Sequence, residues 1–169
     1  MNKTIFKLTL FLALLTISVG YGQKKSYDLQ QLLKENKLIT FKGNAIPITD
    51  GDKKGISLRP SGKSGVREGV VWLKDVTFST GTIEIDLRGK DVLQKSFIGI
   101  AFHGVDTITH DLVYFRPFNF RAEDPVRKIH AVQYVSHPEF PWHVLREKHN
   151  GVYEKGIDPP PLGTEWFHA

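Results

Sequence analysis

The segment Thr82-Ile83-Glu84-Ile85-Asp86-Leu87-Arg88 decides the predicted fold class. Its apolar side chains alternate strictly with polar ones, which is typical of a β-strand that buries one face and exposes the other. Gly81 and Gly89 flank the segment, and glycines often mark the ends of such runs. The pattern therefore predicts a half-buried strand over residues 82–88.

A second segment, Ser96-Phe97-Ile98-Gly99-Ile100-Ala101-Phe102, is apolar on both faces and predicts a strand in the middle of a sheet, covered on both sides. Loops rich in Gly, Pro and Asp separate four further predicted strands, over residues 56–59, 69–73, 111–116 and 130–135. Short strands at this spacing favour an all-β fold in which two antiparallel sheets pack face to face, a jelly-roll or related β-sandwich.

Two short helices are expected beside the strands. Leucines at helical spacing predict one helix within residues 27–36, with Asp28 and Asn36 as cap signals. The second is predicted over residues 142–148, inside a long Pro-rich loop that spans residues 136–163.

The N-terminus has the pattern of a bacterial-type secretory signal peptide. Lys3 and Lys7 are followed by an apolar run over residues 8–19, which is shorter than the roughly 20 residues that a membrane-spanning helix needs. Gly20 and Gly22 are small residues suited to a cleavage site. We therefore expect an exported protein, periplasmic or extracellular, without a membrane span.

The expected organisation is a signal peptide over residues 1–22, a helical segment over 23–37 and one β-sandwich domain over 38–169. The chain contains no cysteine, so we expect neither disulfides nor a lipid anchor. Its net charge is +5, with the basic residues spread along the chain, which argues against a nucleic-acid surface.

No metal or cofactor is predicted. The chain has seven histidines, but His137, His143 and His149 recur every six residues, which would point successive side chains of a helix in different directions. His-Glu-x-x-His does not occur in the sequence, and zinc sites built on paired cysteines are impossible without cysteine.

Four segments together resemble the concanavalin A-like lectin/glucanase superfamily, in particular its bacterial laminin-G-like and 3-keto-disaccharide hydrolase-like domains. They are Gly81-Thr82-Ile83-Glu84-Ile85-Asp86-Leu87, Phe97-Ile98-Gly99-Ile100-Ala101-Phe102, Tyr114-Phe115-Arg116-Pro117-Phe118-Asn119 and Glu165-Trp166-Phe167-His168. The resemblance covers roughly residues 38–169 and implies a carbohydrate ligand. Because strands normally follow the last segment in such domains, we also expect an incomplete sheet edge that a partner chain could cover.

Glu84 and Asp86 are the first catalytic candidates, because alternation places them on one strand face with Arg88. Superfamily glycosidases that resemble the laminarinase group use Glu-x-Asp-x-x-Glu on such a face, but Gly89 stands where the second glutamate would be. Retaining hydrolysis needs two carboxyl groups about 5 Å apart. The alternative that these residues form the polar face of a strand is favoured; if the protein is an enzyme, His130 is the candidate proton relay.

A second set of residues combines an aromatic ring with hydrogen-bonding side chains that suit a polyhydroxylated ligand. The candidate contacts are Tyr114, Arg116, Asn119, Arg121, Gln133 and Trp142. The competing interpretation is structural: the two arginines pair with Glu123 and Asp124 to hold the loop, while the aromatic rings pack.

Three functions remain open from the sequence. The favoured one is an exported carbohydrate-recognition module that binds glycans or their fragments. The alternatives are a glycoside hydrolase of the 3-keto-disaccharide hydrolase-like type and a truncated, inactive paralogue.

Overall fold

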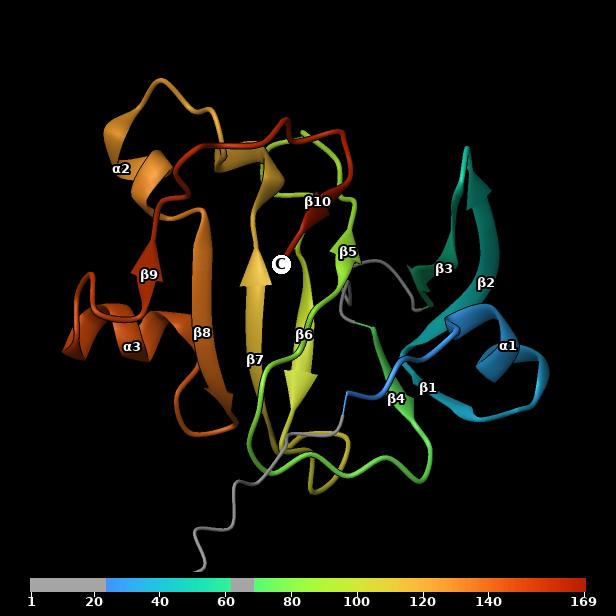
Figure 1. Cartoon of the computed structure of the whole chain (residues 1–169). Helices are drawn as coiled ribbons and strands as arrows, with labels where there is room; N and C mark the ends of the chain where they lie inside the picture. The colour runs from blue at the N-terminus through green and yellow to red at the C-terminus, as the bar shows by residue number, and fades with distance from the viewer. Residues whose placement is uncertain (1–23, 62–68) are drawn as a thin grey trace, which may run out of the picture.

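The structure is a computed structural model that describes residues 24–61 and 69–169. Most of its regular elements are strands in antiparallel sheets, which confirms the all-β prediction (Figure 1). The predicted signal peptide lies outside the described residues. The elements in chain order are α1 (Leu29–Lys34), β1 (Leu38–Phe41), β2 (Gly43–Asp50), β3 (Lys53–Pro60), β4 (Val70–Leu73), β5 (Asp86–Leu87), β6 (Ile98–Phe102), β7 (His110–Phe115), the 3₁₀ helix η1 (Pro117–Asn119), α2 (Pro125–Ile129), β8 (Val132–His137), α3 (Trp142–Lys148), β9 (Glu154–Lys155) and β10 (Phe167–His168).

The largest sheet has the order β6-β7-β8-β9, and all its neighbouring strands are antiparallel. Its register sets Val113 opposite Tyr134 and Gln133 opposite Glu154. Because side chains alternate along a strand, Val113 and Tyr134 share one face, whereas Gln133 and Glu154 share the other. We call the first the open face and the second the helix face, since α3 contacts β8 and buries Leu145 against the second.

Each face of this sheet carries a hydrophobic cluster. On the helix face, Leu145 packs with Tyr114 and Val135. At one end of the open face, Phe167 of β10 packs with Phe120, with its ring centroid 5.1 Å away, and Leu87 of β5 belongs to the same cluster. Figure 1 shows β5 and β10 side by side next to the four-stranded sheet.

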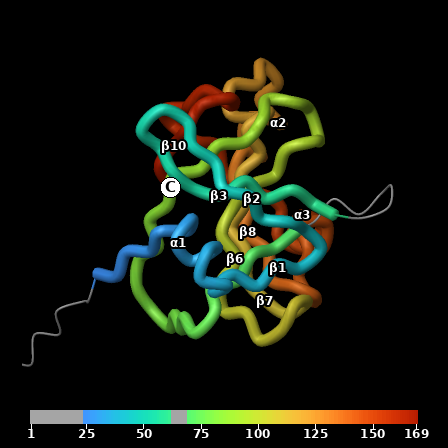
Figure 2. The backbone as a smooth tube through the Cα atoms, turned by 90° about the vertical axis from the view of Figure 1, so that its right-hand side faces the viewer, coloured from blue at the N-terminus to red at the C-terminus, as the bar shows by residue number. Residues whose placement is uncertain are grey.

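The remaining strands form two-stranded ladders, β1 with β4 and β2 with β3. Figure 2, seen from the side of these ladders, shows α1 and the β2–β3 hairpin in front of the larger sheet. Hydrogen bonding thus divides the described strands into four sheets, an arrangement that is compatible with an all-β fold but does not define the two sheets of a jelly-roll.

The strand predicted over residues 82–88 is wrong in extent, because only Asp86 and Leu87 form β5. Its partner β10 is also two residues long, and the pairing continues only through reciprocal 3.0 Å hydrogen bonds between Ile85 and Ala169. The alternation itself is visible in the burial, since Leu87 is buried and its neighbours Asp86 and Arg88 are exposed.

The segment 96–102 forms β6 over Ile98–Phe102. The predicted position in the middle of a sheet is wrong, because β6 lies at the edge of its hydrogen-bonded sheet. All five residues are half-buried. Apolar character on both faces indicates coverage by other side chains, and a strand at a sheet edge can obtain that coverage too.

Both predicted helices are present. Asp28 caps α1 and accepts hydrogen bonds from the backbone N–H groups of Gln30 (2.9 Å) and Gln31 (3.0 Å). The helix α3 begins directly after Pro141, inside the predicted Pro-rich loop.

Within the described residues no helix is long and apolar enough to cross a membrane. The partner chain over a sheet edge stays a prediction.

Gly99 provides a test of how β6 pairs with β7. A Cβ atom at this position would lie 2.1 Å from the carbonyl oxygen of Val113 and 2.6 Å from the Cα atom of Tyr114. Because both obstacles are backbone atoms of the ladder, Gly99→Ala is expected to lower the free energy of unfolding by about 2–3 kcal/mol, measured by urea denaturation. Gly55→Ala, with nothing within 4 Å of its added Cβ, should cause no such loss; equal stability of the two variants would contradict the β6–β7 register.

Candidate functional site

A buried polar cluster on the helix face is centred on Glu154. The side chain of Glu154 is only 2% exposed, and Arg146 of α3 donates to both its oxygens, from Nε to Oε2 at 3.0 Å and from Nη2 to Oε1. Arg116 Nη1 lies 3.4 Å from Oε1, and His130 Nε2 lies 3.2 Å from Oε2. A carboxylate this deeply buried is costly without partners, and here both of its oxygens are paired and hydrogen-bonded.

Arg116 connects this carboxylate to β7 and β8. Its Nη2 atom donates to the hydroxyl of Tyr114 (2.8 Å) and to Oε1 of Gln133 (2.7 Å), while Nη1 donates to the backbone carbonyl of His130 (2.9 Å). Burial lowers the pKa of Arg116 and raises that of Tyr114, whose hydroxyl remains protonated as a hydrogen-bond acceptor for the guanidinium. The four Nη hydrogens of Arg116 are thus directed at protein atoms.

Asn119 closes the cluster on the side of η1 and α2. Its amide nitrogen donates to the carbonyl of His130 at 3.1 Å, and its amide oxygen accepts from Arg127 Nε at 3.2 Å. Arg127 also donates to the carbonyl of Phe118 at 2.7 Å. The seven residues of this Glu154 cluster are Tyr114, Arg116, Asn119, His130, Gln133, Arg146 and Glu154.

The structure therefore brings together five residues singled out in the sequence. However, their polar groups bond one another in the interior, and Gln133 has no exposed surface. The cluster ties β9 and α3 to β7 and β8, so its geometry is that of a support. The predicted pairing of Arg116 with Glu123 or Asp124 is wrong, because Arg116 pairs with Glu154.

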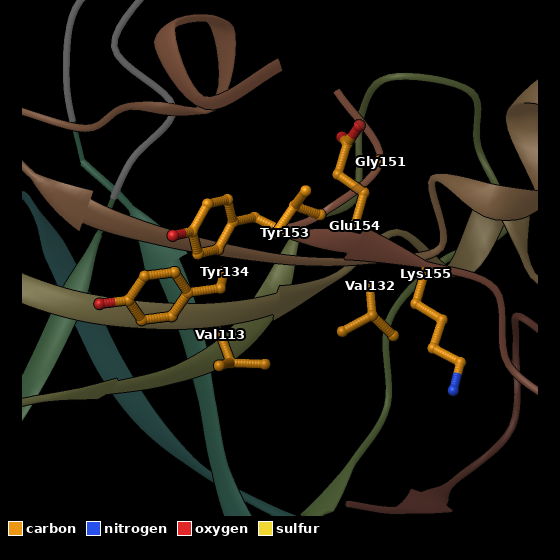
Figure 3. Close-up of a pocket in the computed structure, with 8 residues that line it drawn as sticks. Val113, Val132, Tyr134, Gly151, Tyr153, Glu154 and Lys155 are labelled. Atoms are coloured by element: carbon orange, nitrogen blue, oxygen red, sulfur yellow. The ribbon is translucent and has the colours of Figure 1, made fainter. Parts of the chain in front are cut away.

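A pocket of about 520 Å³ lies on the opposite, open face of β7, β8 and β9 (Figure 3). We call it the tyrosine pocket. Alternation along β9 explains its composition, because Tyr153 and Lys155 flank the inward-pointing Glu154 and so occupy the open face. Figure 3 shows the Glu154 side chain pointing away from that of Lys155. The lining residues are Val113, Val132, Tyr134, Gly151, Val152, Tyr153, Glu154 and Lys155.

The two tyrosine rings of this pocket are held in place by their neighbours. The hydroxyl of Tyr134 donates to Asp111 Oδ1 at 3.0 Å, and Asp111 Oδ2 lies 2.8 Å from His103 Nδ1. The ring of Tyr153 lies 5.8 Å from that of Tyr134, at 32°, and also 5.8 Å from the ring of His149. Both rings are accessible while their orientation is constrained.

A second hollow of about 360 Å³ adjoins the first, and we call it the edge hollow. It lies where β8 is followed by a reversed segment, in which Phe140 pairs with Ser136 through reciprocal backbone hydrogen bonds of 2.7 and 3.1 Å. The two hollows share Tyr134 and Tyr153. The edge hollow is lined by Tyr134, Ser136, Phe140, Leu145, His149 and Tyr153.

The catalytic candidates Glu84 and Asp86 lie on an exposed surface and not beside Tyr114 or Arg116. The Glu84 side chain is 54% exposed and lies 3.4 Å from Lys24 Nζ. Asp86 lies 2.6 Å from Lys53 Nζ and 3.0 Å from His168 Nδ1, and these two contacts lower its pKa. His130, the candidate proton relay, contacts Glu154 instead.

The other two predicted contacts are also elsewhere. Arg121 donates to the carbonyl of Pro160 from Nε (3.2 Å) and Nη2 (3.1 Å), which holds the loop before β10. Trp142 is 47% exposed on α3, and the guanidinium of Arg146 lies 4.9 Å from its ring. Neither lines the tyrosine pocket or the edge hollow.

Sequence reasoning missed Tyr153, Glu154, Lys155 and Arg146. A signal was present: three residues with aromatic, acidic and basic side chains stand between Gly151 and Gly156, as a short strand between turns would. Among the residues that the structure describes, no group of three or more His, Cys, Asp or Glu side chains is placed to hold a metal ion.

Comparison with known proteins gives no relative. No family model, no curated protein and no solved structure matches this chain.

Removal of the central charge tests the cluster. Glu154→Gln leaves two guanidinium groups without their carboxylate, so it is expected to lower the free energy of unfolding by about 3–5 kcal/mol in urea denaturation. Glu84→Gln, which removes an exposed carboxylate, should change stability little. A loss in Glu154→Gln no larger than that in Glu84→Gln would contradict the cluster.

His130 makes the stability depend on pH. Burial lowers its pKa below the ordinary value of 6.5, an effect that Glu154 opposes and that Arg146 and Arg116 reinforce. At pH values near and below 6.5 the unfolded chain binds more protons at His130 than the folded chain does. The contribution of His130 to stability is therefore present above about pH 6.5 and is lost as the pH falls. Urea denaturation between about pH 8 and pH 5.5 should give a smaller pH slope for His130→Gln than for the unchanged protein; identical slopes would contradict this assignment.

Proposed function

We propose that the protein is a carbohydrate-recognition module that binds glycans through the tyrosine pocket. The observation that carries this proposal is the constrained pair of accessible rings, Tyr134 and Tyr153, on the open face of the sheet. An aromatic ring presents a flat apolar surface to the C–H groups of a sugar, while its hydroxyl can take part in hydrogen bonds. Its fixed orientation reduces the entropy lost when a ligand binds.

The rest of the lining suits the same ligand. Val113 and Val132 add apolar surface, and the ammonium group of Lys155 offers three donors for sugar hydroxyls. A pocket of about 520 Å³ lies within the range of about 300–1,000 Å³ that is usual for small-molecule sites. Val152 and Tyr153 are 69% and 38% exposed, so a long glycan could enter from the side.

The binding module is favoured over the hydrolase by the position of the candidate carboxylates. Glu84 and Asp86 are exposed and paired with lysines, away from the Tyr134–Tyr153 pair. Glu154 lines the pocket, but its oxygens are bonded to Arg146 and face the interior. Hydrolysis would need a carboxyl pair directed at the bond that breaks.

Export of the protein and a two-sheet sandwich are also part of this proposal. Export to the periplasm or the outside would place the module where glycans occur, and the pattern of residues 1–22 supports it. In the two-sheet sandwich that we propose, a second sheet packs over the open face, where Phe167 of β10 packs at one end. The tyrosine pocket lies at the margin of that second sheet.

Tyr153→Ala is the variant that tests the proposal. On a glycan array, the purified protein should bind one class of glycan, and Tyr153→Ala should weaken that binding at least about ten-fold, corresponding to about 1.4 kcal/mol. The matched control is Tyr27→Ala, because Tyr27 is similarly exposed (41%) and lines neither hollow.

Folding of each variant is checked by circular dichroism and a melting curve. Equal glycan binding by Tyr153→Ala and the unchanged protein would refute the site. A folded protein that binds no glycan would refute the function.

A further inference from the structure

The tyrosine pocket and the edge hollow are adjacent parts of one surface. Each is bounded by Tyr134 and Tyr153, whose rings stand between them. Val113, Val132 and Lys155 lie only on the pocket side, and Ser136, Phe140 and His149 lie only on the other side. The surface therefore continues past the tyrosine pair along the outer edge of β8.

The length of this surface follows from the strand. Val132 contributes to the tyrosine pocket and Ser136 to the edge hollow, and both belong to β8. Four residues of a strand advance about 13 Å. This span is longer than one pyranose ring, so a single sugar unit cannot reach both ends.

The chemistry of the two hollows also differs. The tyrosine pocket offers aliphatic side chains and one ammonium group, whereas the edge hollow offers the Phe140 ring, which is 41% exposed, and the imidazole of His149. The ring of His149 contacts that of Tyr153 edge-on, at 77°, so a further aromatic group borders the tyrosine pair. Two further aromatic groups, Phe140 and His149, thus lie beyond the tyrosine pair and offer contacts to a second sugar unit.

Resting on the proposed function, we propose that the ligand is an oligosaccharide of at least two units, with successive units in the tyrosine pocket and the edge hollow. The tyrosine pair stacks on the units at the junction. The protein therefore recognises an internal or terminal stretch of a glycan chain rather than a free monosaccharide. Affinity should rise with chain length until both hollows are filled and then stay constant.

The test uses ladders of cello-, laminari- and malto-oligosaccharides from one to six units, titrated calorimetrically into the purified protein. For a ladder that binds, we expect the affinity to rise at least about ten-fold between one and three units and to change little with further units. Phe140→Ala should remove this gain without weakening the binding of the monosaccharide. Leu93→Ala, which shortens an exposed apolar side chain outside both hollows, should preserve the gain.

A second variant tests the same hollow without changing Phe140, in case Phe140→Ala disturbs the local structure. His149→Gln keeps a polar side chain at the end of α3, and it should also reduce the gain with chain length. Equal affinity for one and three units, or equal weakening of both by Phe140→Ala, would overturn the two-hollow ligand while leaving sugar binding intact. Absence of binding by every ladder, together with absence of binding on the glycan array, would overturn the proposed function as well.

Discussion

The burial of the Glu154 carboxylate among two guanidinium groups is the interaction on which the open face of the sheet depends. Glu154 belongs to a strand of two residues, which has two backbone pairs with β8 and one neighbouring backbone hydrogen bond, from Tyr134 to Tyr153. Arg146 reaches it from α3 and Arg116 from the end of β7. A side-chain network thus supplies the attachment that so short a ladder lacks, and it ties a helix to the same point.

Strand alternation transmits this attachment to the other side of the sheet. With Glu154 directed inward, Tyr153 and Lys155 must face outward, and Tyr153 then meets Tyr134 across the ladder. The polar cluster and the tyrosine pocket are therefore two consequences of one register. This relation explains why Arg116 and Gln133, which have the chemistry of ligand contacts, lie beneath the pocket rather than in it.

Local patterns in the sequence predicted the elements that depend on local interactions. Asp28 and the leucines after it indicate α1, and the runs at 111–116 and 130–135 correspond to β7 and β8 within two residues. The extent of β5 and the edge position of β6 were not predictable, because both depend on partners far away in sequence, such as β10. For the candidate site, the sequence identified polar residues in and next to β7 and β8. The side of the sheet that they face depends on their contacts with Glu154, and no periodic pattern in the sequence indicates that residue.

A charged cluster has one advantage over apolar packing at this position. A shift of β9 by one residue along β8 would turn Glu154 to the open face and carry Tyr153 or Lys155 inward, leaving Arg116 and Arg146 without a carboxylate. An apolar side chain in place of Glu154 would tolerate that shift better, because burial of hydrophobic surface is not directional. Buried charge pairs contribute little net stability, but their loss is costly, so the cluster excludes the shifted register more than it stabilises the native one. The order of Tyr153, Glu154 and Lys155 thereby fixes which side chains a ligand can meet.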